Sequence, residues 1–429
     1  MRKRWRRAYK QENLSSVNEA TREFVRLHAG DDVRQLALQG TKDPEVDLPW
    51  ALDQIAGRQK ARTKLPSWAE TEGLEYPPHL SMEQCSSEAT ARYKASMVAP
   101  LNASGSLLDM TGGFGVDFSF MARDFDEAVY VERQPQLCAI AERNFKLLGL
   151  NAEVVCGDGV DYLERTDRCF DLIYLDPARR DDHGGRTYAI SDCTPDVLSL
   201  LPLLLKKGRR TIVKLSPMLD WRKAVSDVGE KWVREVHIVS VDNECKELLL
   251  LIGEGEGLQL VCVNEAPPSI PPKGGKGREI FKVGQTPQSP RKGEEMSRVL
   301  SSPLLGGLRG GHLYEPNASV MKAGCFDELA ACYGVAPLAA NSHLFVSDRQ
   351  IADFPGRQFI VDDVVSMNKR ELKERLGDVT QANIAVRNFP MSVAELRKRL
   401  KLADGGSTYL FATTLADGAH RLLICRKIG

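Results

Sequence analysis

The distribution of apolar positions divides the 429-residue chain into a regular middle and two flanks of different character. In the middle, short apolar runs alternate with longer amphipathic stretches, which is the pattern of a parallel sheet whose strands are joined by crossover helices. We therefore expect an α/β fold there. Seven strands are predicted, within AEVVCGDGVDYL and FDLIYLDPARR and at residues 106–109, 128–133, 210–215, 236–241 and 246–253.

The segments on either side of this middle have other patterns. Residues 17–64 place apolar side chains at near-helical intervals, and several prolines from Pro49 to Pro78 break up the remainder of this flank, so we expect a helical module over 1–77. Residues 265–311 are rich in Pro, Gly and Lys and carry no apolar period, which is typical of a flexible linker. Within it, only EIFKVG could pair as an edge strand.

Regular patterns return after the linker. A turn at 315–317 precedes a helical pattern, and HLFVS, GRQFIVDDVV and ANIAVRNF predict strands. NKRELKERLG predicts a short helix, and a further helix begins with a capping box in which Ser392 is followed three residues later by Glu395. YLFATTL and RLLICRKI are expected to form a hairpin around Asp417-Gly418.

Composition changes this picture little. An apolar fraction of 42% and a charged fraction of 27% are ordinary for a globular protein, and the formal net charge of zero drives no general attraction to nucleic acid. The ten cysteines show no CxxC pair and no metal-ligand spacing, so we expect reduced thiols and no metal site. No apolar run of about 18 residues is present, which predicts a cytoplasmic protein without membrane contact. The basic start, MRKRWRRAYK, is either a disordered arm or a nucleic-acid contact.

A glycine-dense turn follows the first predicted strand, in SLLDMTGGFGVD. Glycine permits sharp turns and close approach of a ligand to the backbone, and nucleotide-type cofactors bind beyond the carboxyl ends of strands in open α/β sheets. We therefore assign the turn to cofactor binding, through Thr111, Gly112, Gly113, Phe114, Gly115 and Asp117.

Carboxylates follow the ends of the neighbouring strands. Glu132 lies about 20 residues beyond the glycines, where an acidic side chain can accept hydrogen bonds from both hydroxyls of a ribose. Asp158, just past the third strand, is placed to contact an adenine edge. Asp109 precedes the glycines, where it would repel a pyrophosphate but suit a cationic ligand such as S-adenosylmethionine (SAM).

The turn has two other interpretations. A dinucleotide fold needs G-x-G-x-x-G, but Phe118 stands where the third glycine would pack helix against strand. The glycines could also only turn the chain. Together with its carboxylates, however, the turn resembles that of the class I SAM-dependent methyltransferases. The resemblance implies a Rossmann-like sheet of seven strands, the last of them antiparallel, with SAM as the cofactor.

The segment before the first strand, EQCSSEATARYK, predicts a helix that Ser86 or Ser87 can cap. In methyltransferases that resemble this chain, this segment often covers the cofactor. The resemblance therefore implies that Ser86 and Thr90, along with Gln84, contact the methionine end of SAM. A capped surface helix explains the same residues.

The fourth strand ends in Asp176-Pro177-Ala178-Arg179. Enzymes that methylate the amino groups of bases carry a related motif, Asp/Asn-Pro-Pro-Tyr/Phe, which holds the exocyclic amine and stacks on the base. The second proline and the aromatic residue are missing here, although an arginine could stack on a base or pair with a phosphate. A strand-terminating turn is the alternative explanation. We assign Asp176, Pro177 and Arg179 to catalysis, and Arg180 and Tyr188 of the following loop to substrate binding.

Residues 356–429 carry thirteen Lys and Arg against eight Asp and Glu, a net charge of +5. Basic residues of the stretch 397–401 cluster on one predicted helix face, which could contact phosphates or simply be solvated. YEPNASVMKAG, FPGRQF and RNFPMSVAELRKRL resemble a family of bacterial class I methyltransferases that end in a ferredoxin-like segment and a THUMP-like domain. Because THUMP domains of related enzymes present RNA, chiefly transfer RNA, the resemblance implies an RNA partner contacted by Arg397 and Arg399.

The sequence thus predicts five regions: a helical module (1–77), a methyltransferase domain (78–264), a linker (265–311), a ferredoxin-like segment (312–355) and a small α+β THUMP-like domain (356–429). The favoured function is methylation of an exocyclic or ring nitrogen in an RNA base. The alternatives are a methyltransferase acting on DNA, protein or a small molecule, and a non-catalytic protein that binds SAM or RNA.

Overall fold

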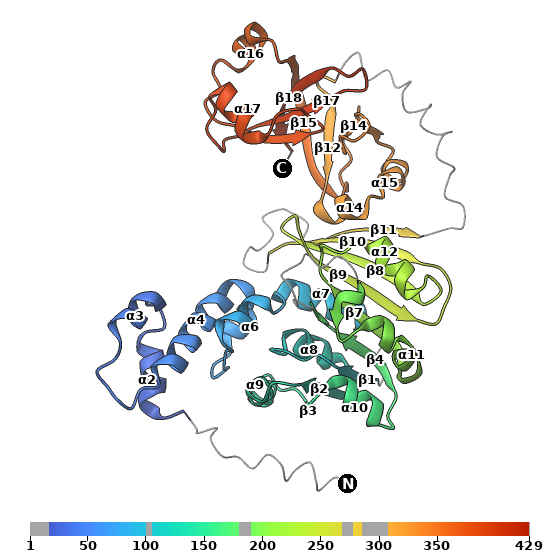
Figure 1. Cartoon of the computed structure of the whole chain (residues 1–429). Coiled ribbons are helices and arrows are strands. Elements are labelled where there is room, and N and C mark those ends of the chain that lie inside the picture. The colour runs from blue at the N-terminus through green and yellow to red at the C-terminus, as the bar shows by residue number, and fades with distance from the viewer. Residues whose placement is uncertain (1–16, 100–104, 180–189, 268–277, 285–307, 429) are drawn as a thin grey trace. The chain divides into compact units, whose positions relative to one another are not determined.

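The computed structural model describes residues 17–99, 105–179, 190–267, 278–284 and 308–428 (Figure 1). These residues form two compact units. The first contains the described residues up to 179 together with 193–213, and the second contains chiefly 214–266 and 278–428. Each unit has its own helices and strands and is described separately below.

Helices build the N-terminal part of the first unit. The first three begin where a side chain accepts a hydrogen bond from the first turn, as Asn18, Asp32 and Asp47 do. The helical pattern predicted over 17–64 is confirmed. The helices are α2 (Glu19–Leu27), α3 (Val33–Gln39), α4 (Leu48–Lys64), α5 (Pro66–Glu70), α6 (His79–Gln84) and α7 (Glu88–Val98).

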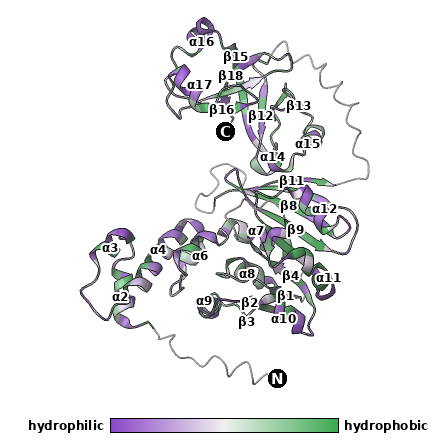
Figure 2. Ribbon diagram, viewed as in Figure 1, coloured by the Kyte–Doolittle hydropathy of each residue, from purple (hydrophilic) through white to green (hydrophobic). Residues whose placement is uncertain are grey.

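A parallel run of strands forms the centre of the first unit, in the order β7-β4-β1-β2-β3. The strands are β1 (Ser106–Asp109), β2 (Glu127–Glu132), β3 (Ala152–Cys156), β4 (Phe170–Leu175) and β7 (Gly208–Leu215). The residues that make up these strands are mainly hydrophobic (Figure 2). The connecting helices are α8 (Val116–Met121), α9 (Pro135–Leu147), α10 (Gly159–Arg165) and α11 (Val197–Lys207), and a short pair of strands, β5 (Ala178–Arg179) and β6 (Cys193–Thr194), follows β4.

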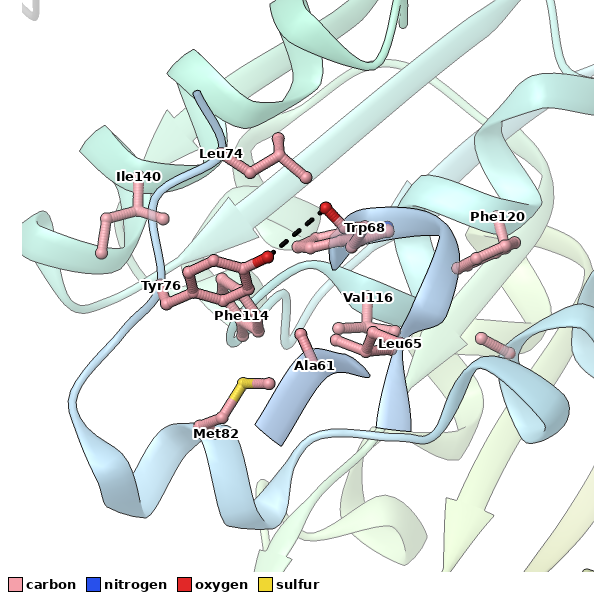
Figure 3. Close-up of a cluster of buried hydrophobic side chains, with 11 residues drawn as sticks. Ala61, Leu65, Trp68, Leu74, Tyr76, Met82, Phe114, Val116, Phe120 and Ile140 are labelled. Carbon is pink, nitrogen blue, oxygen red and sulfur yellow. Dashed lines mark hydrogen bonds between the residues drawn. The ribbon is translucent and has the colours of Figure 1, made fainter. Parts of the chain in front are cut away.

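A hydrophobic cluster packs the N-terminal helices against the glycine turn and the helices after it (Figure 3). Trp68 and Tyr76 both contact the ring of Phe114, with centroids 5.0 and 6.4 Å apart. Replacing a buried tryptophan with alanine typically costs about 3–5 kcal/mol, so this cluster is a major link within the first unit. Its other buried members are Ala61, Leu65, Leu74, Met82, Ala91, Val116, Phe120 and Ile140.

The second unit begins with strands in the order β11-β10-β8-β9, preceded by helix α12 (Trp221–Val228). β8 (Val233–Val241) and β9 (Glu244–Gly253) are antiparallel, as the resemblance implies for the last strand. β10 (Gln259–Glu265) is not among the strands that the sequence predicts. β11 (Arg278–Gly284) is the EIFKVG edge strand. It lies inside the segment predicted as a linker and pairs with β10, which precedes that segment.

The C-terminal part of the second unit is a seven-stranded sheet in the order β13-β14-β12-β15-β18-β17-β16. The predicted capping box of α17 and the hairpin of β17 and β18 are both confirmed, and Gly418 has the left-handed conformation that the tight turn needs (φ 81°). The strands are β12 (His312–Pro316), β13 (Ala336–Pro337), β14 (Phe345–Ser347), β15 (Gly356–Ser366), β16 (Asn383–Arg387), β17 (Thr408–Thr414) and β18 (His420–Lys427). The helices are α14 (Ala318–Ala323), α15 (Phe326–Tyr333), α16 (Lys369–Leu376) and α17 (Val393–Leu400).

Among the residues described, no helix is both long enough and apolar enough to cross a lipid bilayer.

Candidate cofactor site

The glycine turn after β1 is held against the end of β2. The N–H of Gly112 donates to the carbonyl of Val131 at 2.9 Å. A Cβ on Gly112 would lie 2.1 Å from the ring of Tyr130, so no larger residue fits there. Gly113 and Gly115 adopt left-handed φ values of 56° and 83°, which L side chains rarely adopt. The turn therefore requires glycine at all three positions, each for a specific steric or conformational reason.

Glu132 lies directly against this turn. Its Oε2 accepts a hydrogen bond from the N–H of Gly113 at 2.8 Å, and its Oε1 accepts one from the N–H of Gln134 at 2.7 Å. Only 9% of the residue is exposed. The carboxylate is thus fixed at the carboxyl end of β2, beside the backbone that a cofactor would approach.

Asp109 ends β1 and is buried. Its Oδ1 accepts a hydrogen bond from the N–H of Thr111 at 2.9 Å. Burial raises the pKa of Asp109 well above its usual range, and the neighbouring carboxylates of Asp117, Asp176 and Glu132 act in the same direction, against the lowering effect of the Thr111 hydrogen bond. A cation placed here would relieve this crowding of acidic groups.

Asp158 has the opposite electrostatic surroundings. It caps α10, accepting hydrogen bonds from the N–H groups of Val160 and Asp161 at 2.8 and 3.1 Å, and it pairs with the guanidinium of Arg133. Partial burial alone would raise its pKa, but the backbone hydrogen bonds and Arg133 outweigh burial and hold the pKa of Asp158 below its usual value. Asp158 is therefore an ionised acceptor at the end of β3.

The end of β4 meets the glycine turn through Asp176. Its N–H donates to Oγ1 of Thr111 at 2.7 Å, and Pro177 is buried beside it. The backbone of Arg179 forms β5 and pairs with Cys193. Two residues predicted to bind substrate, Arg180 and Tyr188, lie outside the described residues.

Phe114, Ser86 and Thr90, all predicted to bind the cofactor, have buried side chains with partners inside the protein. The side chain of Phe114 belongs to the hydrophobic cluster described above (Figure 3). Ser86 donates to Asp117 at 2.8 Å. Thr90 is 1% exposed, and its hydroxyl donates to the carbonyl of Ser87, the residue that caps α7.

Two further residues of this site, both tyrosines, are not among those that the sequence predicts. Tyr130 and Tyr174 are the register partners of Asp109 in β2 and β4, so the three side chains lie on one face of the sheet. Tyr130 donates to the carbonyl of Gly113, and Tyr174 donates to Asp117 at 2.7 Å. Their signal in the sequence is an aromatic residue near the end of each flanking strand, but its meaning depends on strand register, which one sequence does not give.

The basic residues predicted to bind RNA through α17 are largely engaged within their own domain. Arg397 donates to Asp404 at 2.5 Å and to the carbonyl of Ala382, and its side chain is 25% exposed. Arg399 is exposed and donates to the carbonyl of Met367 at 3.4 Å. Arg399, with Lys398 beside it, is therefore the more available cation of this helix.

No group of three or more His, Cys, Asp or Glu side chains that could hold a metal ion is found in the described part of the chain. The glycine turn, by contrast, fits an organic cation. A Cβ on Gly113 would meet nothing closer than 3.8 Å, so the backbone is open on that side, and the carboxylates of Glu132 and Asp109 accept from N–H groups of the turn. A parallel β7-β4-β1-β2-β3 arrangement with a glycine turn after β1 and an acidic residue ending β2 defines the class I SAM-dependent methyltransferase fold.

Comparison with known proteins gives the family. Residues 312–355 match the family described as a ferredoxin-like domain, and residues 356–427 match the one described as THUMP domain-like. A crystal structure from Porphyromonas gingivalis W83, that of a provisionally assigned methyltransferase, is 32% identical with a TM-score of 0.78, covering 96% of this chain and 98% of that one. The chain therefore belongs to the family of class I SAM-dependent methyltransferases that end in ferredoxin-like and THUMP-like domains.

More distant structures add nothing on substrate. An rRNA methylase from Streptococcus thermophilus is 15% identical with a TM-score of 0.29, covering 38% of this chain and 96% of that one. No protein among the curated sequences matches the chain.

Proposed function

We propose that this protein binds SAM at the glycine turn and transfers its methyl group to a nitrogen of an RNA base. The observation that supports cofactor binding most strongly is the convergence of Asp109, Glu132 and Asp158 on the carboxyl ends of β1, β2 and β3. In this proposal Glu132 accepts from the ribose hydroxyls, Asp158 contacts the adenine, and Asp109 faces the positive charge. When bound, SAM supplies an electrophilic methyl group.

The chain's own contribution to the chemistry is alignment and proton handling. Asp176 follows β4, and its backbone N–H donates to Thr111 of the glycine turn, which keeps the residue close to that turn. We assign it to accept a proton from, or to orient, the nitrogen that is methylated. Pro177 shapes this end of β4, and Arg179, with Arg180 and Tyr188, would contact the base or its phosphate.

RNA is proposed as the substrate because residues 356–427 match the THUMP domain-like family and because residues 356–429 are basic within a neutral chain. Arg399 and Lys398 are exposed on α17 and would contact phosphates. Arg397 would support these two residues while it stays paired with Asp404. The Asp-Pro-Ala-Arg sequence differs from the motif of the amino-methylating enzymes. Because of this difference, DNA, protein or a small molecule is kept as the alternative substrate.

The test is methyl transfer from isotopically labelled SAM into bulk RNA, DNA and protein, followed by mass spectrometry of the nucleosides. We expect label in RNA, and at least about a hundredfold slower transfer by Asp176→Ala, in the range that positioned acid–base groups contribute. Label in DNA or protein but not in RNA would favour the alternative. Transfer into none of them would contradict the catalytic assignment.

A further inference from the structure

A buried ion pair lies beside the glycine turn. The side chain of Lys94 in α7 is 0% exposed, and its Nζ lies 3.1 Å from Oδ1 of Asp117, whose side chain is 10% exposed. The other oxygen of Asp117 accepts from Ser86 Oγ at 2.8 Å and from Tyr174 Oη at 2.7 Å. Lys94 also donates to Ser86 at 3.3 Å. We call these four residues the Lys94 network.

The Lys94 network joins three segments of the first unit. Ser86 and Lys94 come from the segment before β1, and α7, which carries Lys94, packs on α8. Asp117 lies in the first turn of α8, directly after the glycine turn. Tyr174 lies in β4, beside Asp109 in register and two residues before Asp176. A displacement of any one segment would therefore disturb the other two.

Stability alone does not account for a charge in this position. A buried ion pair replaced by well-packed apolar residues often leaves a protein equally or more stable. What an apolar pair cannot do is fix an ionised acceptor to which two hydroxyls donate. Hydrogen bonds to an ionised group are about twice as strong as neutral ones, so the ammonium of Lys94 strengthens the bonds by which Asp117 holds Ser86 and Tyr174.

We propose that Lys94 and Tyr174 are positioning residues for the cofactor. They hold Asp117, and through it the α7 segment, against the glycine turn in the arrangement that SAM binds. Ser86 and Asp117 then act through this network and not by contact with the cofactor. The inference rests on the proposed function, because Lys94 and Tyr174 would organise the SAM site that is proposed there.

The test compares Lys94→Met and Tyr174→Phe with the unchanged protein in SAM titration calorimetry and in steady-state methyl transfer. We expect Lys94→Met to raise the KM for SAM about tenfold or more, while kcat at saturating SAM changes by less than about threefold, the split expected when binding geometry is lost and chemistry is not. Tyr174→Phe removes one hydroxyl and no charge. Tyr174→Phe should therefore also raise the KM for SAM, but by a smaller factor than Lys94→Met. If Lys94→Met does not fold, Tyr174→Phe alone tests the inference.

Glu88→Gln is the matched control. Glu88 is another buried acid of α7, but its carboxylate pairs with Arg92 and accepts from Ser67, neither of which belongs to the Lys94 network. The substitution should lower the melting temperature without changing the KM for SAM. The inference is wrong if both network variants bind SAM like the unchanged protein, or if Glu88→Gln raises the KM equally. Absence of SAM binding by the unchanged protein would instead contradict the proposed function itself.

Discussion

Two aspartates at the carboxyl ends of β1 and β3 are in opposite electrostatic states. Burial, with three carboxylates nearby, raises the pKa of Asp109, whereas backbone hydrogen bonds and Arg133 outweigh burial and lower the pKa of Asp158. Asp109 therefore destabilises the fold when it ionises, and Asp158 stabilises the fold when it ionises. A site that keeps a costly acid beside an open glycine backbone is suited to a ligand that brings positive charge.

The first prediction concerns Asp109→Asn. Because the pKa of Asp109 is higher in the folded chain than in the unfolded one, the folded chain binds more protons between these two values, and stability falls as pH rises through that interval. Asparagine keeps an oxygen for the N–H of Thr111 and has no charge to bury. The gain in the free energy of unfolding from Asp109→Asn should thus be larger at pH 7.5 than at pH 4.5, as measured by urea denaturation.

Asp126→Asn, at an exposed aspartate, provides the control for that measurement and should show no such difference. A gain from Asp109→Asn that is the same at both pH values would show that Asp109 is not held in a costly ionised state.

The second prediction concerns Gly112→Ala. The added Cβ would fall 2.1 Å from the Tyr130 ring, so strand β2 or the turn must shift. Overpacking of this kind costs about 1–3 kcal/mol, and the shift should also abolish SAM binding. Gly30→Ala, where a Cβ meets nothing within 4 Å, should leave both quantities unchanged. Tight SAM binding by Gly112→Ala would contradict the role of the turn.

At the scale of helices and strands, the sequence predicts what local patterns determine. The glycine turn, the capping box of Ser392 and the hairpin at Gly418 each depend on residues close in sequence, and the structure has all three elements. The Lys94 network and the tyrosines beside Asp109 depend on register and on packing between distant segments. β10 is absent from the prediction because the seven-stranded sheet that the resemblance implies ends with the strand before it, although QLVCV itself has the apolar and β-branched character of a strand.

The third prediction belongs to α17. Ser392 accepts from the N–H of Glu395, and the Glu395 carboxylate accepts from the N–H of Ser392, so Ser392→Ala removes one half of a reciprocal cap. Loss of such a cap costs about 1 kcal/mol, measurable as a lower unfolding midpoint of the C-terminal domain. Ser407→Ala, in the exposed turn before β17, should have no effect. Equal unfolding midpoints for the two variants would show that the capping box is not formed in solution.

For the whole molecule, the C-terminal domains are the part that distinguishes this family from a plain methyltransferase. They are not simply appended, because α14 packs on β8, β9 and β10 within the second unit. Deleting residues 312–429 would expose the surface of β8, β9 and β10 on which α14 packs. A loss of RNA binding could then not be distinguished from a loss of folding. Charge reversal on exposed side chains is therefore the cleaner way to test RNA recognition.

The fourth prediction is for the double substitution Lys398→Glu and Arg399→Glu. If α17 binds phosphates, RNA affinity should fall, and the slope of log affinity against log salt should decrease in magnitude by about 1 for each phosphate that the helix no longer neutralises. Lys369→Glu with Lys373→Glu, on the exposed face of α16, is the charge-matched control. An equal loss in both double variants would mean that only overall charge matters, and no loss in either would place RNA binding elsewhere.

The central claim is that carboxylates at successive strand ends gather around an open glycine backbone because a cationic adenosyl ligand binds there. The most direct measurement is a crystal structure of this chain grown with SAM. We predict the ligand on the glycine turn, with its ribose hydroxyls within hydrogen-bond distance of Glu132 and its positive charge facing Asp109. A structure in which SAM lies elsewhere, or in which Glu132 and Asp109 point away from an empty turn, would contradict the account.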